Sequence, residues 1–371
     1  MSYSLATLWY ERHRYMPGVL AVGFSALLIA LQCGLLLGLF SITSIPVDHT
    51  RAHLWVGAPQ TLSVDLGRPM PESYLLRVAS QPGVEKAEIY IQGFAYWGKP
   101  NGGSELCMVI GSRLESDSLG AVKELTPELR ARLTEPGAII VDESDIGRLG
   151  IKGIGDVGEI IGQRVRVVGL VKGLRSLAGP YVLASINTAR PLLRLSQEQT
   201  TYVLARCRHK SDAPGVVAKL RDFTSMTAFT QDEFSLRTRM HWLTKTKAGI
   251  ALGCAAALGL LVGAIVTSQT LYAATAASIR EYAVLQALGI PRWRMALTVL
   301  AQSFWVGILG IAVAVPVVLL LTQGAEMVNA PLQLPSWLLA LAVGVTMTMA
   351  MASGLAALRS LRLVEPATLL R

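Results

Sequence analysis

Residues 17–45 read PGVLAVGFSALLIALQCGLLLGLFSITSI, a continuous run without a single Asp, Glu, Lys or Arg. The run exceeds the ~20 apolar residues that a helix needs to cross the hydrocarbon core of a bilayer. Backbone groups that face lipid must be hydrogen-bonded within their own segment, so we expect a transmembrane helix here. The run is also longer than the ~7–15-residue apolar core of a signal peptide, and the N-terminus lacks a small-residue cleavage pattern. We therefore expect the run to remain attached as a membrane anchor, with residues 1–16 before it as a cytoplasmic segment.

Three further stretches have the same apolar character, namely residues 248–277, 295–321 and 337–358. Between the first and second stretch, residues 46–247 are too many and too charged to lie at membrane depth, so they must form a folded aqueous domain. Only the short connector 322–336 separates the third stretch from the fourth. The expected fold class is a membrane α-helical protein with four transmembrane helices and a large α+β extracytoplasmic domain.

The composition of the chain agrees with a membrane location. Apolar residues make up 52% of the chain, charged residues only 16%, and the mean hydropathy is +0.45. The formal net charge of +9 would suit a nucleic-acid-binding protein. The Lys and Arg residues are scattered, however, and they form no run with interleaved aromatic residues. We therefore expect membrane lipids, and no nucleic acid, among the partners of this chain.

Basic residues near the span ends predict the orientation, because they are retained on the cytoplasmic side of short loops. The arginines near the span ends would all lie on one side: Arg12, Arg14, Arg280, Arg292, Arg294, Arg359, Arg362 and Arg371. Residues 322–336 contain no Lys or Arg, which fits the opposite face. Lys245 and Lys247 go against this pattern, but long translocated domains are largely exempt from the rule. We expect a multi-pass protein of the bacterial inner membrane, with residues 46–247 periplasmic and both termini, including the tail 359–371, cytoplasmic.

The aqueous domain has the pattern of an α/β unit that is interrupted by a β-rich insert. The α/β unit would comprise about 46–112 and 200–232, the insert about 113–199, and a helical stalk about 232–247. Runs rich in β-branched and aromatic residues predict the strands, and glycine and proline mark the turns between them. The expected strands are 87–91, 138–142, 164–171, 181–184, 201–206 and 226–229, and the expected helices are 77–81 and 213–223.

Small residues at a four-residue spacing on the first two spans predict close helix packing. The pairs are Gly34 with Gly38, Gly249 with Gly253, and Gly259 with Gly263. Three pairs on two helices favour a seam between copies in an oligomer. The alternative is that glycine is simply common in membrane helices. The spans carry no charged side chain near mid-depth, which disfavours an ion-driven pump.

The sequence contains no motif for catalysis. It has no G-x-x-x-x-G-K-[ST] phosphate loop, no H-E-x-x-H and no G-x-S-x-G, so we assign no catalytic residue and no metal site. If ATP drives the protein, a separate subunit must bind ATP and Mg, and this chain is not expected to be an enzyme. His49 and His53 have a spacing that suits metal binding on one helix face, but two polar residues at the base of the domain are the favoured reading.

Cys107 and Cys207 both fall in the oxidising compartment, each in or beside an expected strand. A disulfide between them and a pair of free thiols are both compatible with the sequence. Cys33 and Cys254 lie within spans and are interpreted as small packing residues.

Residues 278–294, SIREYAVLQALGIPRWR, join the second and third spans on the cytoplasmic side. Charged residues flank an apolar centre, and Gly289 followed by Pro291 is typical of a helix end. The pattern predicts a short amphipathic helix along the inner membrane face. Such a helix either docks onto a partner or lies on the membrane surface.

Within this segment, residues 280–289, REYAVLQALG, resemble the R-E-x-A-x-L-x-A-L-G signature of the MacB/FtsX superfamily of ABC permeases. The layout of one span, a large outer domain and three further spans is also similar to that family, as is the tail VEPA at 364–367. Inside the superfamily, LWVG at 54–57, RPMP at 68–71 and GFAYW at 93–97 look most like the DevC-like branch.

The resemblance implies a MacB-like type VII ABC permease fold and a homodimer with one ABC ATPase subunit beneath each permease, without a transmembrane channel. A heterodimer is the alternative assembly. Closure of the ATPase would be transmitted through the stalks to the outer domains, which is called mechanotransmission. The resemblance implies that the helix that couples to the ATPase consists of Arg280, Glu281, Tyr282, Leu285, Leu288 and Gly289. Its first two residues would form polar contacts with the ATPase, and its apolar face would be buried against it.

DevC-like members work with a periplasmic adaptor and an outer-membrane duct, so the resemblance implies a tripartite exporter of a lipid-like or amphiphilic substrate. The alternative is an FtsX-like transducer, which activates an extracytoplasmic enzyme and moves no substrate. FtsX-type outer domains are generally smaller than residues 46–247, and this favours the exporter.

Overall fold

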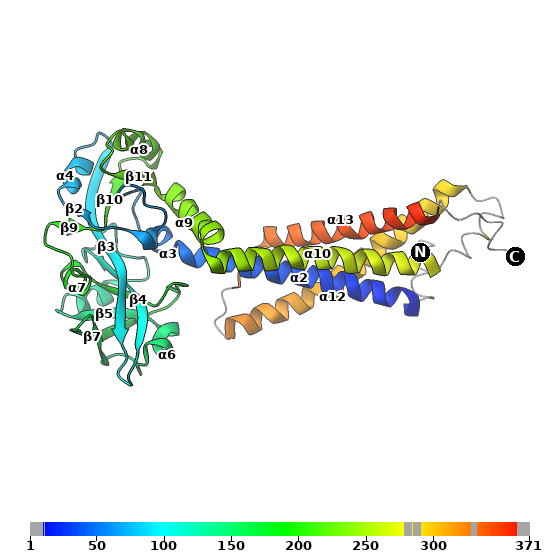
Figure 1. Ribbon diagram of the computed structural model, residues 1–371, viewed down its shortest axis with the longest axis horizontal. Coiled ribbons are helices and arrows are strands. Elements are labelled where there is room, and N and C mark those ends of the chain that lie inside the picture. Colours follow the sequence, from blue (N-terminus) through cyan, green and yellow to red (C-terminus); the bar gives the residue numbers. More distant parts are fainter. Residues whose placement is uncertain (1–9, 11, 278–283, 285–290, 328–331, 362–371) are drawn as a thin grey trace. The chain divides into compact units, whose positions relative to one another are not determined.

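The computed structural model describes residues 10, 12–277, 284, 291–327 and 332–361 (Figure 1). The chain divides into two compact units. Residues up to 39 and from 250 onward form the membrane unit, and residues 40–249 form the outer unit.

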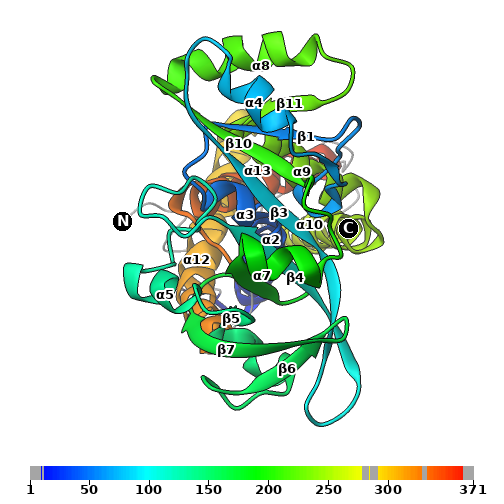
Figure 2. The ribbon, with the colours of Figure 1, turned by 90° about the vertical axis from the view of Figure 1, so that its left-hand side faces the viewer.

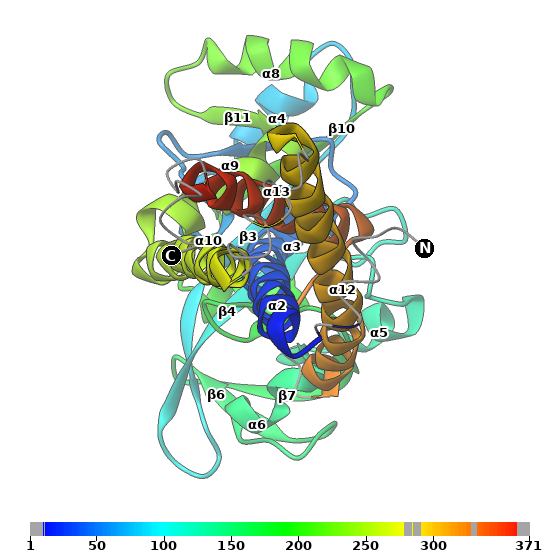
Figure 3. The same cartoon turned by 90° about the vertical axis from the view of Figure 1, so that its right-hand side faces the viewer.

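The membrane unit consists of long apolar helices: α2 (Arg12–Thr43), α10 (Lys247–Ala277), α12 (Arg292–Met327) and α13 (Ser336–Leu361). Within the described residues, four helical stretches are long and apolar enough to span a bilayer: Tyr15–Thr43, Lys247–Thr270, Ala296–Ala325 and Ser336–Leu355. The prediction of four membrane helices is thereby confirmed. Figure 3 shows these helices nearly end on. Val22 of α2, Val306 of α12 and Ala350 of α13 are buried in one apolar cluster.

One part of the outer unit is an antiparallel sheet with two helices on one face. In chain order it contains β1 (Leu54–Gly57), α4 (Tyr74–Ala79), β3 (Val84–Gly98), β10 (Tyr202–Cys207), α8 (Ala213–Arg221) and β11 (Thr227–Thr230). The strand order is β11-β1-β10-β3. Val78 of α4 and Leu220 of α8 lie in the apolar cluster on one face of the sheet, with Val56 and Val203. This connectivity is the split β-α-β arrangement of ferredoxin-like folds.

The other part of the outer unit is a closed barrel. Its strands follow the order β3, β4 (Ser104–Ser112), β8 (Tyr181–Ser185), β5 (Ala138–Asp142), β7 (Gln163–Val171) and β6 (Val157–Ile160). The barrel closes because β6 also pairs with β3, Ile160 opposite Trp97. Trp97, Val109 and Val167 are buried in the cluster that fills the interior. Figure 2 shows the barrel strands below the ferredoxin-like part.

Strand β3 belongs to both parts. Residues 84–90 pair with β10, whereas Ile91–Gly98 pair with β4. The expected boundary between the α/β unit and the insert, at about residue 113, therefore does not coincide with a break in the sheet. The second half of β3 and all of β4 precede residue 113 and yet form barrel strands. A local pattern predicts that a segment is a strand, but not which strands it pairs with.

The remaining elements are short connections and the stalk. The predicted helical stalk is α9 (Gln231–Lys245), and β2 (Met70–Pro71) pairs with β9 (Gln199–Thr200). The other short elements are α3 (Ile45–Asp48), η1 (Val64–Leu66), α5 (Pro127–Arg132), η2 (Glu143–Asp145), α6 (Ile146–Leu149), α7 (Ile186–Leu192) and η3 (Lys210–Asp212).

Candidate coupling junction

Two short helices connect the outer unit to the spans. Helix α2 ends at Thr43 and α3 begins at Ile45, while α9 ends at Lys245 and α10 begins at Lys247. The chain therefore joins the first two spans to the outer unit through α3 and α9. We call the contacts between these two helices the coupling junction.

A charged side chain of α9 binds α3 directly. Arg239 Nη2 lies 2.6 Å from Asp48 Oδ2, and Arg239 Nε donates to Ser44 Oγ at 2.8 Å. Ser44 Oγ in turn donates to Asp48 Oδ2 at 2.6 Å. About two helical turns before Arg239 on α9, Gln231 Nε2 donates to the Val47 carbonyl oxygen at 3.0 Å. Because the two helices are joined near both ends of α3, we expect them to move together.

Helix α9 is anchored in the sheet by an aromatic side chain. Phe234 is fully buried, and its ring centroid lies 4.9 Å from Phe229, 5.6 Å from Trp55 and 5.8 Å from Tyr202. These partners lie on β11, β1 and β10. The helix begins at this anchor because Thr230 accepts a hydrogen bond from the Glu233 N–H, which satisfies one of the free donors of the first turn.

Farther along α9, polar contacts join the helix to the loop that contains η1. Arg237 Nε donates to the Thr61 carbonyl oxygen at 3.2 Å, and Thr238 Oγ1 accepts from the Val64 N–H at 3.2 Å. Trp242 Nε1 donates to Asp65 at 3.3 Å. The outer unit therefore holds α9 over most of its length.

The two histidines at the base of the domain have separate partners. His49 Nδ1 lies 2.7 Å from Glu124 Oε1, whereas His53 Nδ1 accepts from the Cys207 N–H at 3.2 Å. Burial lowers the pKa of His49, and the Glu124 carboxylate opposes this effect. Burial also lowers the pKa of His53, with Lys210 acting in the same direction. The described part of the chain contains no group of three or more metal-ligating side chains.

The predicted coupling residues Arg280, Glu281, Tyr282, Leu285, Leu288 and Gly289 lie outside the described residues. Their role as the ATPase-coupling helix stays a prediction.

Two of the predicted packing glycines on α10 face α2 of the same chain. A Cβ on Gly263 would lie 3.2 Å from Ser25 Cβ, and one on Gly259 would lie 2.9 Å from Gln32 Cδ. Ser25 Oγ also lies 2.9 Å from Thr267 Oγ1. These glycines therefore serve packing between α2 and α10 within one chain, while a seam between copies stays a prediction.

The other predicted glycines have different surroundings. Gly34 of α2 accepts a backbone hydrogen bond from Gln333 at 3.2 Å and lies against the Leu334 side chain. Gly249 lies against the Trp242 carbonyl group, where α9 passes into α10. Gly38 and Gly253 lie on α2 and α10.

The disulfide alternative for Cys107 and Cys207 is wrong, because both thiols are free and buried. Cys107 pairs with Ala95 of β3 and Cys207 with Val84 of the same strand. Along β3 these positions are 11 residues apart, about 36 Å in a fully extended strand at ~3.3 Å per residue, whereas a disulfide requires Cα atoms within ~7 Å. Burial raises the pKa of the Cys107 thiol to about 12.

Sequence reasoning missed the Arg239–Asp48 pair and the close approach of α2 to α12. A Cβ on Gly23 would lie 3.1 Å from the Gly310 carbonyl oxygen. The four-residue spacing rule finds glycines on one helix, but these two lie on different helices. No local signal in the sequence connects residue 48 with residue 239.

Comparison with known proteins finds a family match for one part of the chain. Residues 253–366 match the model of the family described as FtsX-like permease C-terminal. No curated protein matches the chain.

Solved structures of permease and transporter domains are similar to part of the chain. The periplasmic region of MacB from Actinobacillus actinomycetemcomitans is 10% identical with a TM-score of 0.35, and the match covers 50% of this chain and 92% of that one. The extracellular domain of the noncanonic ABC-type transporter YknZ from Gram-positive bacteria is 11% identical with a TM-score of 0.33, over 47% of this chain and 98% of that one. A domain of a permease protein from Porphyromonas gingivalis is 13% identical with a TM-score of 0.30, over 50% and 90%.

Proposed function

We propose that this chain is a member of the MacB/FtsX superfamily of ABC permeases and the permease subunit of an ATP-driven exporter that works by mechanotransmission. The observation that carries the proposal is the FtsX-like permease match over residues 253–366, which include two of the four membrane helices and most of a third. Membership of this family implies an ABC ATPase partner. In our proposal that partner binds and hydrolyses ATP with Mg, and this chain transmits the resulting movement.

The coupling junction supports a mechanical role. Arg239 joins α9 to Asp48 and Ser44, so the two connections to the spans are braced against each other. Phe234 is buried among aromatic side chains of three strands. Packed interiors deform little and transmit strain. A displacement of α9 would therefore displace the ferredoxin-like sheet as well.

The assembly that we propose has two copies of the permease in the bacterial inner membrane, each above one ATPase subunit. The outer units would lie in the periplasm and meet an adaptor that leads to an outer-membrane duct. The cargo would be lipid-like or amphiphilic. The apolar spans and the arginines at their ends support this placement.

Purification of the intact complex, with mass spectrometry of the bound subunits and small molecules, tests this proposal. We expect an ABC ATPase and an adaptor to copurify with the chain. A complex that contains no nucleotide-hydrolysing subunit would refute the proposal. A copurifying cell-wall hydrolase in place of the adaptor would instead favour an FtsX-like transducer.

The variant Glu281→Lys tests the coupling helix in the same complex. Reversing this charge is expected to lower the stimulation of the ATPase at least ~10-fold, about 1.4 kcal/mol of coupling energy, and to abolish export while the outer unit stays folded. Glu128→Lys, at an exposed position in the first turn of α5, is the matched charge reversal and should leave both activities unchanged. Unchanged stimulation and export in Glu281→Lys would show that this segment is not the coupling helix.

A further inference from the structure

The long segment between β4 and α5, residues 113–126, has no helix or strand, and yet its central residues 118–122 are buried in the outer unit. Ser118, Leu119, Ala121, Val122 and Leu125 are each at most 2% exposed. Loops normally run over the surface, where water satisfies their backbone groups. Burial of this segment, which we call the connecting loop, indicates that protein groups replace that water.

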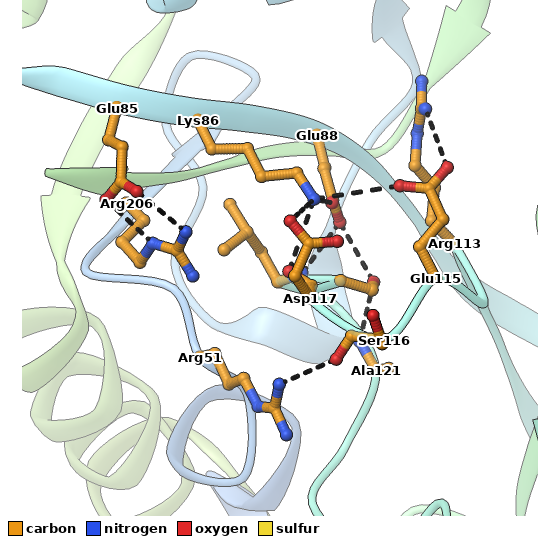
Figure 4. Close-up of polar contacts among 12 residues, drawn as sticks. Arg51, Glu85, Lys86, Glu88, Arg113, Glu115, Ser116, Asp117, Ala121 and Arg206 are labelled. Atoms are coloured by element: carbon orange, nitrogen blue, oxygen red, sulfur yellow. Dashed lines mark hydrogen bonds and ion pairs between the residues drawn. The ribbon is translucent and has the colours of Figure 1, made fainter. Parts of the chain in front are cut away.

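On one side, the connecting loop binds the residues that follow α3. The Arg51 N–H donates to the Leu119 carbonyl oxygen at 3.0 Å, and Arg51 Nη1 donates to the Ser116 carbonyl oxygen at 3.0 Å (Figure 4). The Lys123 N–H donates to the His49 carbonyl oxygen at 3.0 Å. The segment that follows α3 is thus hydrogen-bonded to the connecting loop through the backbone of both His49 and Arg51.

On the other side, the connecting loop binds the barrel through Arg130 of α5. This side chain is only 8% exposed, and its guanidinium donates to the carbonyl oxygens of Leu125 at 3.0 Å, Ser116 at 3.2 Å and Glu115 at 3.3 Å. Burial of a charged group is costly unless it is well hydrogen-bonded, so these three acceptors hold the loop in one conformation.

Helix α5 is itself attached to the barrel. Arg132 Nη1 donates to the Val168 carbonyl oxygen on β7 at 3.2 Å. The Leu129 side chain lies against Gly169, where a Cβ would come within 2.6 Å of it. Displacement of α5 would therefore displace β7.

A third set of contacts fixes the loop to β3. Glu88 is 1% exposed, and its Oε2 accepts from the Leu119 N–H at 2.8 Å and from Ser118 Oγ at 3.0 Å. Lys86 Nζ lies 2.7 Å from both Glu88 Oε1 and Asp117 Oδ2 (Figure 4). Glu88 and Lys86 lie in the half of β3 that pairs with β10, so the loop touches both parts of the outer unit.

We infer that the connecting loop transmits movement of α3 to the barrel, with Arg51 and Arg130 as the positioning residues. Both guanidinium groups donate to the Ser116 carbonyl oxygen, Arg51 from the segment that follows α3 and Arg130 from α5. The second span reaches the ferredoxin-like sheet through Phe234, and the first span reaches the barrel through this loop. The inference rests on the proposed function, because ATP hydrolysis by the partner would supply the movement.

Spin-label distances in the complete complex test the inference. Labels at Lys172→Cys in the barrel and Lys219→Cys on α8 report the barrel against the ferredoxin-like sheet, and Thr244→Cys in both copies reports the stalk. Cys33 and Cys254 are replaced by alanine in every sample. Distances are measured by double electron–electron resonance with and without ATP.

The variants are Arg51→Gln and Arg130→Lys. Each replaces the guanidinium group that donates to the connecting loop by a smaller donor, and neither changes the buried apolar residues of that loop. Arg113→Gln is the matched control, since Arg113 belongs to the same loop and, among the residues that the structure describes, forms a single 3.6 Å ion pair, with the exposed Glu115. A thermal melt of each complex confirms that the variants fold. We expect the ATP-dependent shift of the barrel pair to shrink at least twofold in Arg51→Gln and Arg130→Lys, with the stalk shift unchanged.

Three other outcomes are informative. A barrel shift of wild-type size in both variants would overturn the role of the loop. A stalk shift without any barrel shift in the wild type would overturn it as well and leave the proposed function standing. If neither pair responds to ATP in the wild-type complex, the proposed function itself fails.

Discussion

Two buried carboxylates of the outer unit, Glu88 and Asp145, differ in how well their oxygens are satisfied by polar partners. Glu88 has hydrogen-bond donors on one oxygen and Lys86 on the other. Asp145 is only 5% exposed, and its Oδ2 has no hydrogen-bond partner within the described structure. Arg148 lies 3.6 Å from Asp145 Oδ1 and also binds Glu105 at 3.0 Å. Burial therefore raises the pKa of Asp145 to about 6, and Arg148 only partly opposes this rise.

The raised pKa of Asp145 makes stability depend on pH in a defined direction. The folded chain holds this proton more tightly than the unfolded chain, whose Asp pKa is about 3.9, so stability is lost as the pH rises from about 4 to about 6. We expect Asp145→Asn to gain about 2–3 kcal/mol relative to the wild type between pH 4 and pH 7. Urea unfolding of the full chain in detergent, followed by tryptophan fluorescence, measures the difference.

Asp222→Asn, at an exposed position beside the end of α8, is the control and should show no such gain. A pH-independent difference between Asp145→Asn and the wild type would mean that Asp145 titrates in its ordinary range.

Among the elements, α9 is a helix whose position the sequence predicts but whose buried face it does not. A helical stalk is expected at about residues 232–247, and the observed helix is Gln231–Lys245, which begins at the N-cap Thr230 and has acidic residues in its first turn. The face that is buried is less evident, because polar and apolar residues alternate around the helix. Phe234 and Thr238 are buried, whereas Leu236 and Met240 are 60% and 47% exposed. Tertiary contacts with β1, β10 and β11 select that face.

Truncation of Phe234 is expected to loosen α9 from the sheet. Phe234→Ala removes a fully buried ring and leaves a cavity among aromatic partners, which costs about 3–5 kcal/mol of unfolding free energy for the outer unit. Leu236→Ala is the matched truncation on the exposed face and should cost less than ~0.5 kcal/mol. Urea unfolding monitored by fluorescence, to which the neighbouring Trp55 contributes, gives both values. A loss below about 1 kcal/mol for Phe234→Ala would show that α9 is not anchored there.

Strand β3, in contrast to α9, is an element whose length the sequence did not predict. The expected strand 87–91 covers only the middle of the observed Val84–Gly98. The second half carries aromatic residues on both faces: Trp97 is buried inside the barrel, while Tyr96 is 63% exposed. Only the closure of β6 onto β3 explains why one face is interior.

For the whole molecule, the arginine pattern predicts that the outer unit lies outside the cytoplasm and the loop between the second and third spans lies inside. In a background with Cys33 and Cys254 replaced by alanine, a membrane-impermeant maleimide should label Asn101→Cys on intact spheroplasts. Arg294→Cys should be labelled only after permeabilisation. Cys107 is buried and serves as an internal control that stays unlabelled. Labelling of Arg294→Cys from outside would contradict the proposed orientation.

The amino-acid sequence by itself determined the number of membrane helices, the presence of a large domain between the first two spans, and the similarity of residues 253–366 to FtsX-like permeases. These properties depend on hydrophobicity and motifs within short segments, where transfer free energies add along the chain. Only the tertiary structure decided that the insert closes into a barrel, that Cys107 and Cys207 lie far apart, and that Arg239 binds Asp48. Such contacts join residues that are distant in the chain, and no periodicity or spacing encodes the partner that burial and hydrogen bonding select.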